Sequence, residues 1–250
     1  MSLIDLAAVS FAYGRSRKVL HDIDLRIEAG RNLGIVGESG SGKTTILRLL
    51  LGLARPTSGR IAFRGEPLDP RDRLFMRGFR RSVQAVFQDP YSSLDPRQKV
   101  ADIIAEPLRS LNVDTDIDAA VAEALASVDL PSGAAGRYPH EFSGGQRQRI
   151  AIARAIVSQP ELVLADEVVS ALDLTTRIRI VDLLKSLSER TTLVLVSHDI
   201  GFVALLCQDL VILEKGRIVE QGSARNILSA PKHPYTQRLL ESTPRLPDFT

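Results

Sequence analysis

The strongest constraint on the fold is the eight-residue segment 37–44, GESGSGKT, which follows the pattern G-x-x-x-x-G-K-[ST]. Glycines in this pattern let the backbone curl so that several N–H groups point at one anion, and a following helix adds its dipole. The segment lies between the apolar stretches 32–36 and 45–53, which we expect to form a strand and a helix. This context favours a phosphate-binding loop over the alternative, a glycine-rich turn that caps an ordinary helix.

The chemistry of a bound triphosphate assigns a role to each part of this loop. Lys43 is expected to reach the β- and γ-phosphates, and the Thr44 hydroxyl is expected to hold Mg²⁺. The sequence therefore predicts that the chain binds ATP together with Mg²⁺. The residues expected to contact the nucleotide here are Gly37, Glu38, Ser39, Gly40, Ser41, Gly42, Lys43, Thr44 and Thr45.

Two adjacent carboxylates follow the continuously apolar stretch 162–165, which we expect to be a buried strand. A magnesium-bound triphosphate needs one carboxylate near the metal and a second that takes a proton from the attacking water. Asp166 suits the metal and Glu167 suits the water. By itself the pair is also typical of a helix N-cap beside a loop acid, and the presence of Lys43 favours the catalytic interpretation.

The remaining pattern indicates an α/β domain that is interrupted by a mostly helical insertion. Within the insertion, Ile117, Val121, Leu125 and Val128 recur at helical spacing on one face. Lys215 and Gly216 form a predicted hairpin turn. We expect strands at 3–9, 20–27, 32–36, 59–64, 82–87, 162–165, 192–196, 210–213 and 217–220, and helices at 45–53, 173–187 and 200–206.

Charge and cysteine content exclude several classes of protein. The chain has 32 basic and 30 acidic side chains among 250 residues, so no strong field for nucleic acid is expected, and the basic stretch 71–81 is interpreted as solvated surface. The single cysteine, Cys207, excludes a disulfide framework and a cysteine-based metal site within the chain, and fits a reducing cytosol. The N-terminus lacks the pattern of a signal peptide. No run approaches the roughly 20 apolar residues of a membrane helix, so work at a membrane is expected to be peripheral.

A second glycine-rich segment, 142–146, reads FSGGQ and precedes an apolar helical pattern. Ser143 and Gln146 have the spacing of a capping box, and the two glycines between them also expose N–H groups to an outside anion. The segment resembles the signature loop of the ABC ATPases. That resemblance implies that Ser143, Gly144, Gly145 and Gln146 contact the γ-phosphate held by a partner subunit.

Other elements of that family occur in the expected order along nearly the whole chain. Tyr13 resembles the aromatic residue that stacks on adenine, although an edge-strand aromatic is the alternative. Gln88 resembles the Q-loop glutamine, which meets Mg²⁺ and the attacking water, and residues 170–173 resemble the D-loop. His198 resembles the switch histidine at the γ-phosphate, although a histidine at a strand end is usually a surface residue. The implied catalytic residues are Glu167, His198, Gln88 and Lys43, and the implied metal contacts are Thr44, Gln88 and Asp166.

The resemblance implies a P-loop NTPase core, a mixed or parallel sheet flanked by helices, with an N-terminal antiparallel β subdomain and an inserted α-helical subdomain. We expect the core at about 1–97 and 158–250 and the helical subdomain at about 98–157. Two residues depart from the family pattern: Phe142 stands where leucine is usual, and Val168 where many relatives carry proline. Neither departure removes a ligand, but loss of the proline is expected to loosen the D-loop.

Three segments point to a narrower branch. Residues 88–97, 138–141 and 233–240 resemble the dipeptide, oligopeptide and nickel importers, although His233 and Pro234 are also typical of a simple helix start. The implied function is an ATP-hydrolysing subunit that energises uptake of peptides or a related small solute, nickel included, from the cytoplasmic side of the membrane. The implied partners are a second ABC ATPase, identical or sister, membrane permeases and, indirectly, an extracytoplasmic solute-binding protein.

Alternatives from other classes stay open at this point. A non-transport ABC ATPase that serves a soluble enzyme complex, of the carbon–phosphorus lyase type, can have a very similar sequence. Translation-associated ABC factors usually carry two such domains, and DNA-repair relatives insert a long coiled coil, and neither feature is present. P-loop kinases and GTPases lack the signature loop.

Overall fold

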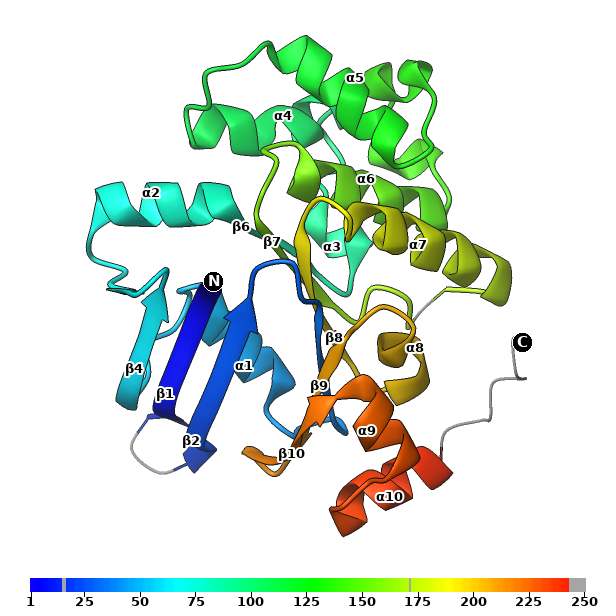
Figure 1. Cartoon of the computed structure of the whole chain (residues 1–250). Helices are drawn as coiled ribbons and strands as arrows, with labels where there is room; N and C mark the ends of the chain where they lie inside the picture. Colours follow the sequence, from blue (N-terminus) through cyan, green and yellow to red (C-terminus); the bar gives the residue numbers. More distant parts are fainter. Residues whose placement is uncertain (15–16, 171, 243–250) are drawn as a thin grey trace. The chain divides into compact units, whose positions relative to one another are not determined.

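The computed structural model describes residues 1–14, 17–170 and 172–242. The chain divides into two compact units (Figure 1). The first comprises Met1–Asp72 with Thr192–Thr250, and the second comprises Arg73–Thr191. The phosphate-binding loop belongs to the first unit, and the acidic pair and the signature segment belong to the second.

An antiparallel sheet of order β2-β1-β4-β5 opens the first unit (Figure 1, blue to cyan). Ile4 of β1 lies opposite Ile27 of β2 and Phe63 of β4, and all three side chains are buried. Buried and exposed residues alternate along the second strand, as expected for a sheet with one covered face. The four strands are β1 (Ser2–Tyr13), β2 (Arg17–Glu28), β4 (Ser58–Phe63) and β5 (Glu66–Pro67).

The second set of strands in this unit has the order β10-β9-β3-β8. Strand β3 runs parallel to both β8 and β9, and its last residue, Val36, pairs with Ser197 of β8. Because parallel strands end at the same edge of a sheet, the residues after Val36 and Ser197 emerge side by side. The bounds are β3 (Leu33–Val36), β8 (Thr192–Ser197), β9 (Asp209–Glu214) and β10 (Arg217–Ser223), with helices α1 (Lys43–Leu50), α8 (Ile200–Ala204), α9 (Ala224–Ser229) and α10 (Pro234–Glu241).

The second unit contains two parallel strands and most of the helices (Figure 1, cyan to yellow). Helices α4, α5 and α6 pack against one another through buried aliphatic side chains. Strand β6 pairs with β7 so that Val86 lies opposite Ala165. The bounds are α2 (Arg73–Ser82), β6 (Val83–Val86), α3 (Pro90–Ser93), α4 (Val100–Ser110), α5 (Ile117–Ser127), α6 (Gly144–Ile156), β7 (Leu162–Asp166) and α7 (Leu174–Leu187), with 3₁₀ turns at Ser132–Gly136 and Pro139–Glu141.

The predicted α/β class, with its antiparallel N-terminal sheet and helix-flanked core, is confirmed. The helix predicted at 45–53 is shorter and earlier, because Gly52 takes a φ of 64° and ends it after Leu50. The basic stretch 71–81 is more than solvated surface: most of it forms α2, which buries Met76 and Phe79 and exposes its arginines. Helix α9 is short and was not predicted, whereas the helix start considered at His233 and Pro234 is present, with His233 as the N-cap of α10. The predicted helical subdomain at about 98–157 falls inside the second unit, and its boundaries stay a prediction.

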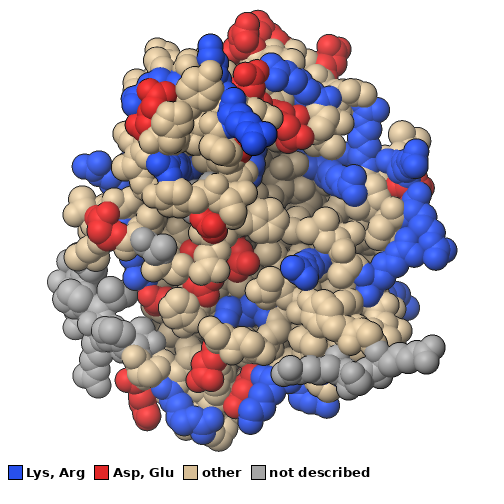
Figure 2. All heavy atoms as spheres, turned by 180° about the vertical axis from the view of Figure 1, so that it is seen from behind, with Lys and Arg blue, Asp and Glu red and all other residues tan. Residues whose placement is uncertain are grey.

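The face shown in Figure 2 carries both signs of charge. Lys and Arg, Asp and Glu, and uncharged side chains all occur on it, and neither sign covers the face alone. Over the residues that the structure describes, no helix has the length and apolar character needed to cross a bilayer.

Candidate functional site

The phosphate-binding loop connects β3 to α1 in the first unit, and two of its glycines are sterically required. A side chain at Gly37 would bring its Cβ to 2.3 Å from the Leu213 carbonyl oxygen of β9. Gly42, the N-cap of α1, has a φ of 113°, and its Cβ would lie 2.7 Å from Leu20 of β2. A Cβ at either position would clash with these neighbours, and residues other than glycine seldom adopt the backbone conformation of Gly42. The loop conformation is therefore fixed by packing against the strands beside it.

Lys43, the first residue of α1, folds back across the loop. Its Nζ donates hydrogen bonds to the carbonyl oxygens of Gly37, at 2.6 Å, and Glu38, at 3.0 Å, and the side chain is only 8% exposed. The Ser41 hydroxyl is also buried and has no hydrogen-bond partner among the described residues. A buried cation beside an unsatisfied hydroxyl, at the N-terminus of a helix, fits a phosphate group.

Tyr13, the residue predicted to stack on adenine, lies beside helix α1, which also carries Lys43. The Tyr13 hydroxyl lies 3.4 Å from the Thr45 Oγ1, and Arg48 of α1 donates to it at 3.4 Å. The Tyr13 ring packs edge-on against Phe11, with ring centroids 4.8 Å apart, and is 48% exposed. An exposed aromatic face next to the phosphate loop is available for stacking, and the stacking role itself stays a prediction.

His198 leaves β8 at the edge where the phosphate loop leaves β3, because Ser197 pairs with Val36. The imidazole is exposed, and the next residue, Asp199, caps α8 by accepting the Phe202 N–H at 2.9 Å. The first unit thus places the phosphate loop, Tyr13 and His198 around one end of its parallel strands.

In the second unit, the acidic pair and Gln88 share an edge for the same reason. Asp166 is the last residue of β7 and is 9% exposed, and Gln88 follows the end of β6 by two residues. Glu167 has a φ of 49°, in the left-handed region that residues other than glycine seldom adopt. Its carbonyl oxygen accepts hydrogen bonds from both the N–H and the hydroxyl of Ser170, which hold this conformation. Such held conformations cluster at functional sites.

The signature segment forms the start of α6, as predicted. The Ser143 hydroxyl accepts the Gln146 N–H at 3.3 Å, and the Gln146 side chain accepts the Ser143 N–H at 3.0 Å, which confirms the capping box. Phe142 is buried beneath the Arg137 guanidinium, 4.5 Å from its ring centroid, so the larger residue fills an apolar site. Val168 is buried as well.

Two contacts around this segment were not foreseen from the sequence. Arg147 of α6 lies 4.1 Å over the ring of Tyr91 in α3, and Gly145 packs against Thr176 in the first turn of α7. Asp173, at the predicted D-loop, caps α7, and the Thr176 N–H and hydroxyl that it accepts lower the pKa of its carboxyl. The signature turn and the D-loop helix are thus neighbours within one unit.

The close packing of Gly145 against Thr176 leads us to expect an effect of substitution on the free energy of unfolding. In Gly145→Ala the new Cβ would lie 2.3 Å from the Thr176 Cγ2, so we expect the free energy of unfolding to fall by about 1–3 kcal/mol. In the matched control Gly144→Ala, the Cβ meets only the Tyr91 hydroxyl at 3.9 Å, and no loss is expected. Thr176→Ser removes the clashing methyl and keeps the hydroxyl, so it should restore most of the loss. Denaturant unfolding of five proteins checks this: the wild type, Gly145→Ala, Gly144→Ala, Thr176→Ser and the double variant Gly145→Ala/Thr176→Ser. Additive losses in the double variant would contradict the prediction.

A magnesium ion that arrives with a triphosphate needs few protein ligands, because it keeps phosphate and water oxygens around it. In the part of the chain that the structure describes, no three His, Cys, Asp or Glu side chains gather to hold a metal by themselves. The exposed Thr44 hydroxyl at the start of α1 and the Asp166 carboxylate at the end of β7 are oxygen donors of the required kind.

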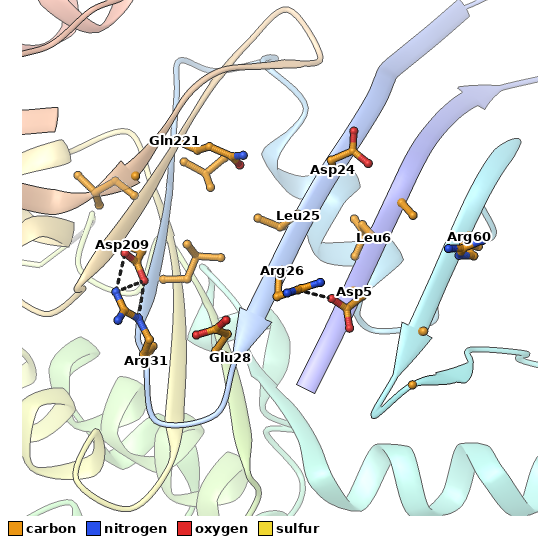
Figure 3. Close-up of a pocket in the computed structure, with 17 residues that line it drawn as sticks. Asp5, Leu6, Asp24, Leu25, Arg26, Glu28, Arg31, Arg60, Asp209 and Gln221 are labelled. Carbon is orange, nitrogen blue, oxygen red and sulfur yellow. Dashed lines mark hydrogen bonds and ion pairs between the residues drawn. The ribbon is translucent and has the colours of Figure 1, made fainter. Parts of the chain in front are cut away.

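A surface cavity of about 800 Å³ in the first unit lies away from these residues (Figure 3). It is crossed by two ion pairs: Arg26 binds Asp5 at 2.8 Å, and Arg31 binds Asp209 at 2.8 Å. None of the predicted site residues lines it. These two ion pairs involve four of the seven charged residues that line the cavity, which lies beside the N-terminal sheet.

Comparison with protein families gives two matches. Residues 20–170 match the family described as ABC transporter, and residues 219–248 match the family described as the C-terminal region of oligopeptide/dipeptide transporters. The dipeptide transport ATP-binding protein DppF of Escherichia coli (strain K12) is 43% identical over 241 residues, which cover 94% of this chain and 72% of that protein.

Two solved structures share the fold along most of their length. CbiO1 of Clostridium perfringens, part of the ABC transporter complex cbiONQ, matches with a TM-score of 0.82 and 27% identity, over 92% of this chain and 91% of that one. The ATP-binding cassette MJ0796, solved as a dimer in a post-hydrolysis state with ADP and Pi bound, matches with a TM-score of 0.79 and 29% identity, over 89% and 99%.

Proposed function

This chain belongs to the ABC transporter family as an ATP-hydrolysing subunit, and from this premise we propose that it energises the import of peptides. The observation that carries the choice of substrate class is the C-terminal match at 219–248, a region shared with oligopeptide and dipeptide transporters. The first part of this region forms most of β10 together with α9 and α10. The name of the E. coli relative supports the same class.

In the proposed reaction, MgATP is the substrate and the phosphate loop holds its triphosphate. The N–H groups of the loop and the Lys43 ammonium neutralise the β- and γ-phosphates, and Thr44, Asp166 and Gln88 face the magnesium and its water shell. Glu167 accepts a proton from the water that attacks the γ-phosphorus. His198 donates to the γ-phosphate oxygens and stabilises the charge that develops on them.

We propose that two such ATPase subunits close head to tail around two MgATP molecules. The N-terminus of α6, with Ser143 as its cap and two glycines in its first turn, is then presented to the γ-phosphate bound by the partner subunit. ATP binding favours the closed pair and hydrolysis reopens it. The motion is passed to membrane permeases, with the subunit on the cytoplasmic face of the membrane.

Isolation of the native assembly tests this proposal. The tagged chain, expressed in its native host, is purified in mild detergent, and the co-purifying proteins are identified by mass spectrometry. We expect multi-span permeases, with or without a second ATPase. After reconstitution into vesicles, ATP-dependent uptake of labelled peptides should follow, and an assembly that carries Glu167→Gln is the matched control without turnover.

Two outcomes of this experiment would contradict parts of the proposal. Uptake of nickel but not of peptides would support the role in import and overturn the choice of peptides as the substrate class. Recovery of soluble enzymes alone, under conditions that preserve membrane complexes, would overturn import and favour the soluble helper ATPase.

A further inference from the structure

One peptide unit of the phosphate loop, between Gly37 and Glu38, is held at both of its polar ends. Its carbonyl oxygen, on Gly37, accepts a 2.6 Å hydrogen bond from the Lys43 Nζ. Its N–H, on Glu38, donates a 2.9 Å hydrogen bond to the hydroxyl of Tyr235 in α10. Because the peptide group is planar, fixing the direction of the N–H also fixes the direction of the carbonyl. Tyr235 therefore orients the carbonyl that holds the Lys43 ammonium.

Tyr235 is suited to hold a fixed acceptor in this place. The residue is 4% exposed, and burial raises the pKa of its phenol against the opposing effect of the Glu38 N–H. The hydroxyl accordingly stays neutral across the physiological pH range, and its oxygen accepts the N–H. Arg238, one turn along α10, lies 6.0 Å from the ring centroid and 3.8 Å from the Glu214 carboxylate, which ties the helix to the end of β9.

The segment that carries Tyr235 is anchored independently of the loop. The two carboxylate oxygens of Glu220 in β10 accept the N–H groups of Lys232, at 2.9 Å, and His233, at 3.1 Å. The His233 Nδ1 then accepts the Tyr235 N–H at 3.2 Å and caps α10. Burial alone would raise the pKa of the Glu220 carboxyl, but its hydrogen bonds, among them those from the Lys232 and His233 N–H groups, outweigh burial and lower that pKa. The carboxylate is thus charged at neutral pH and holds the start of the helix.

The same C-terminal half of the unit contacts the loop a second time. Gly216, in the turn between β9 and β10, donates its N–H to the Ser41 carbonyl at 2.8 Å. The chain runs from this turn through β10, where Glu220 lies, to α10 and Tyr235. Both ends of this stretch therefore hold backbone groups of the phosphate loop.

We propose that Tyr235 is a positioning residue for nucleotide binding: the C-terminal segment uses its hydroxyl to hold the Gly37–Glu38 peptide, and through it Lys43, in the orientation that receives the triphosphate. This inference rests on the proposed function, in which Lys43 binds the β- and γ-phosphates. Without the hydroxyl, the loop spends part of its time in conformations that do not receive the triphosphate. The apparent affinity for nucleotide then falls in proportion to the fraction of protein that keeps the binding conformation.

The test is the variant Tyr235→Phe, which removes the hydroxyl and keeps the ring. We expect the dissociation constants of ATP and ADP, and the KM for ATP, to rise roughly 2- to 10-fold, as the net strength of one hydrogen bond allows. The kcat at saturating ATP should stay within twofold of the wild type, because Glu167 is unchanged. Amide hydrogen exchange of Glu38 should become faster in the nucleotide-free protein.

Two further variants separate positioning from general stability. Glu220→Gln presents only one acceptor to the two N–H donors of the segment, so it should weaken nucleotide binding in the same direction without touching Tyr235 or the loop. Ser242→Ala removes a hydrogen bond of the α10 C-terminus, from its hydroxyl to the Leu239 carbonyl, and should leave nucleotide affinity unchanged. If Tyr235→Phe does not fold, Glu220→Gln against Ser242→Ala carries the test.

Lys43→Ala distinguishes failure of this inference from failure of the proposed site. Unchanged ATP affinity in Tyr235→Phe, together with lost affinity in Lys43→Ala, would overturn the positioning role and leave the proposed phosphate site intact. Unchanged affinity in both variants would overturn both. An equal loss of affinity in Ser242→Ala and Tyr235→Phe would also overturn the positioning role, since it would reflect the stability of α10 alone.

Discussion

Replacing Glu167 by glutamine is expected to abolish ATP turnover while leaving ATP binding intact. The amide has nearly the shape of the carboxylate but cannot accept a proton from the attacking water, and a general base contributes roughly 10²–10⁴-fold to such a reaction. We expect kcat to fall at least about 100-fold, with the ATP dissociation constant within threefold of the wild type. Phosphate release and nucleotide titration measure the two quantities.

The same variant should accumulate a dimer in the presence of ATP, because the closed pair no longer reopens through hydrolysis. Size-exclusion chromatography with light scattering, with and without ATP, detects it. Glu161→Gln is the matched control: this glutamate directly precedes β7, at the opposite end of the strand from Asp166, and turnover should be unchanged. A kcat for Glu167→Gln within tenfold of the wild type would remove Glu167 from the role of base.

Replacing Lys43 by alanine is expected to weaken nucleotide binding itself. The ammonium is held by the carbonyl oxygens of Gly37 and Glu38 at the start of α1, and a hydrogen bond to a charged group is worth about 1.5–3 kcal/mol. The dissociation constant of ATP should therefore rise roughly 10- to 150-fold. Isothermal titration or a fluorescent nucleotide measures it.

Lys185→Ala is the matched control for the loss of one positive charge. Lys185 is exposed in the last turn of α7, and its replacement should leave ATP affinity unchanged. Thermal unfolding without nucleotide identifies any loss that comes from instability. An ATP dissociation constant for Lys43→Ala within twofold of the wild type would show that the loop does not bind the triphosphate through this residue.

Features that are encoded over a few consecutive residues were predictable from the sequence alone. The strand–loop–helix arrangement around 37–44 was predictable because its glycines and its apolar flanks are contiguous, and a loop of this kind has few alternative backbone paths. The capping box of Ser143 and Gln146 was predictable for the same reason, since its partners are three residues apart. The buried strands were predictable from their unbroken runs of apolar residues.

The identity of the distant segments that support these local motifs became clear from the three-dimensional fold. Tyr235 and Glu38 are 197 residues apart in sequence, and no local pattern indicates that a helix hydroxyl meets a loop amide. The contact of Gly145 with Thr176 likewise depends on how α7 packs beside α6. His198 lies beside the loop because β8 pairs with β3 in a register that sets Ser197 opposite Val36. Local sequence fixes backbone conformation through sterics and short-range hydrogen bonds, whereas these contacts arise from strand register and helix packing, which depend on the whole chain.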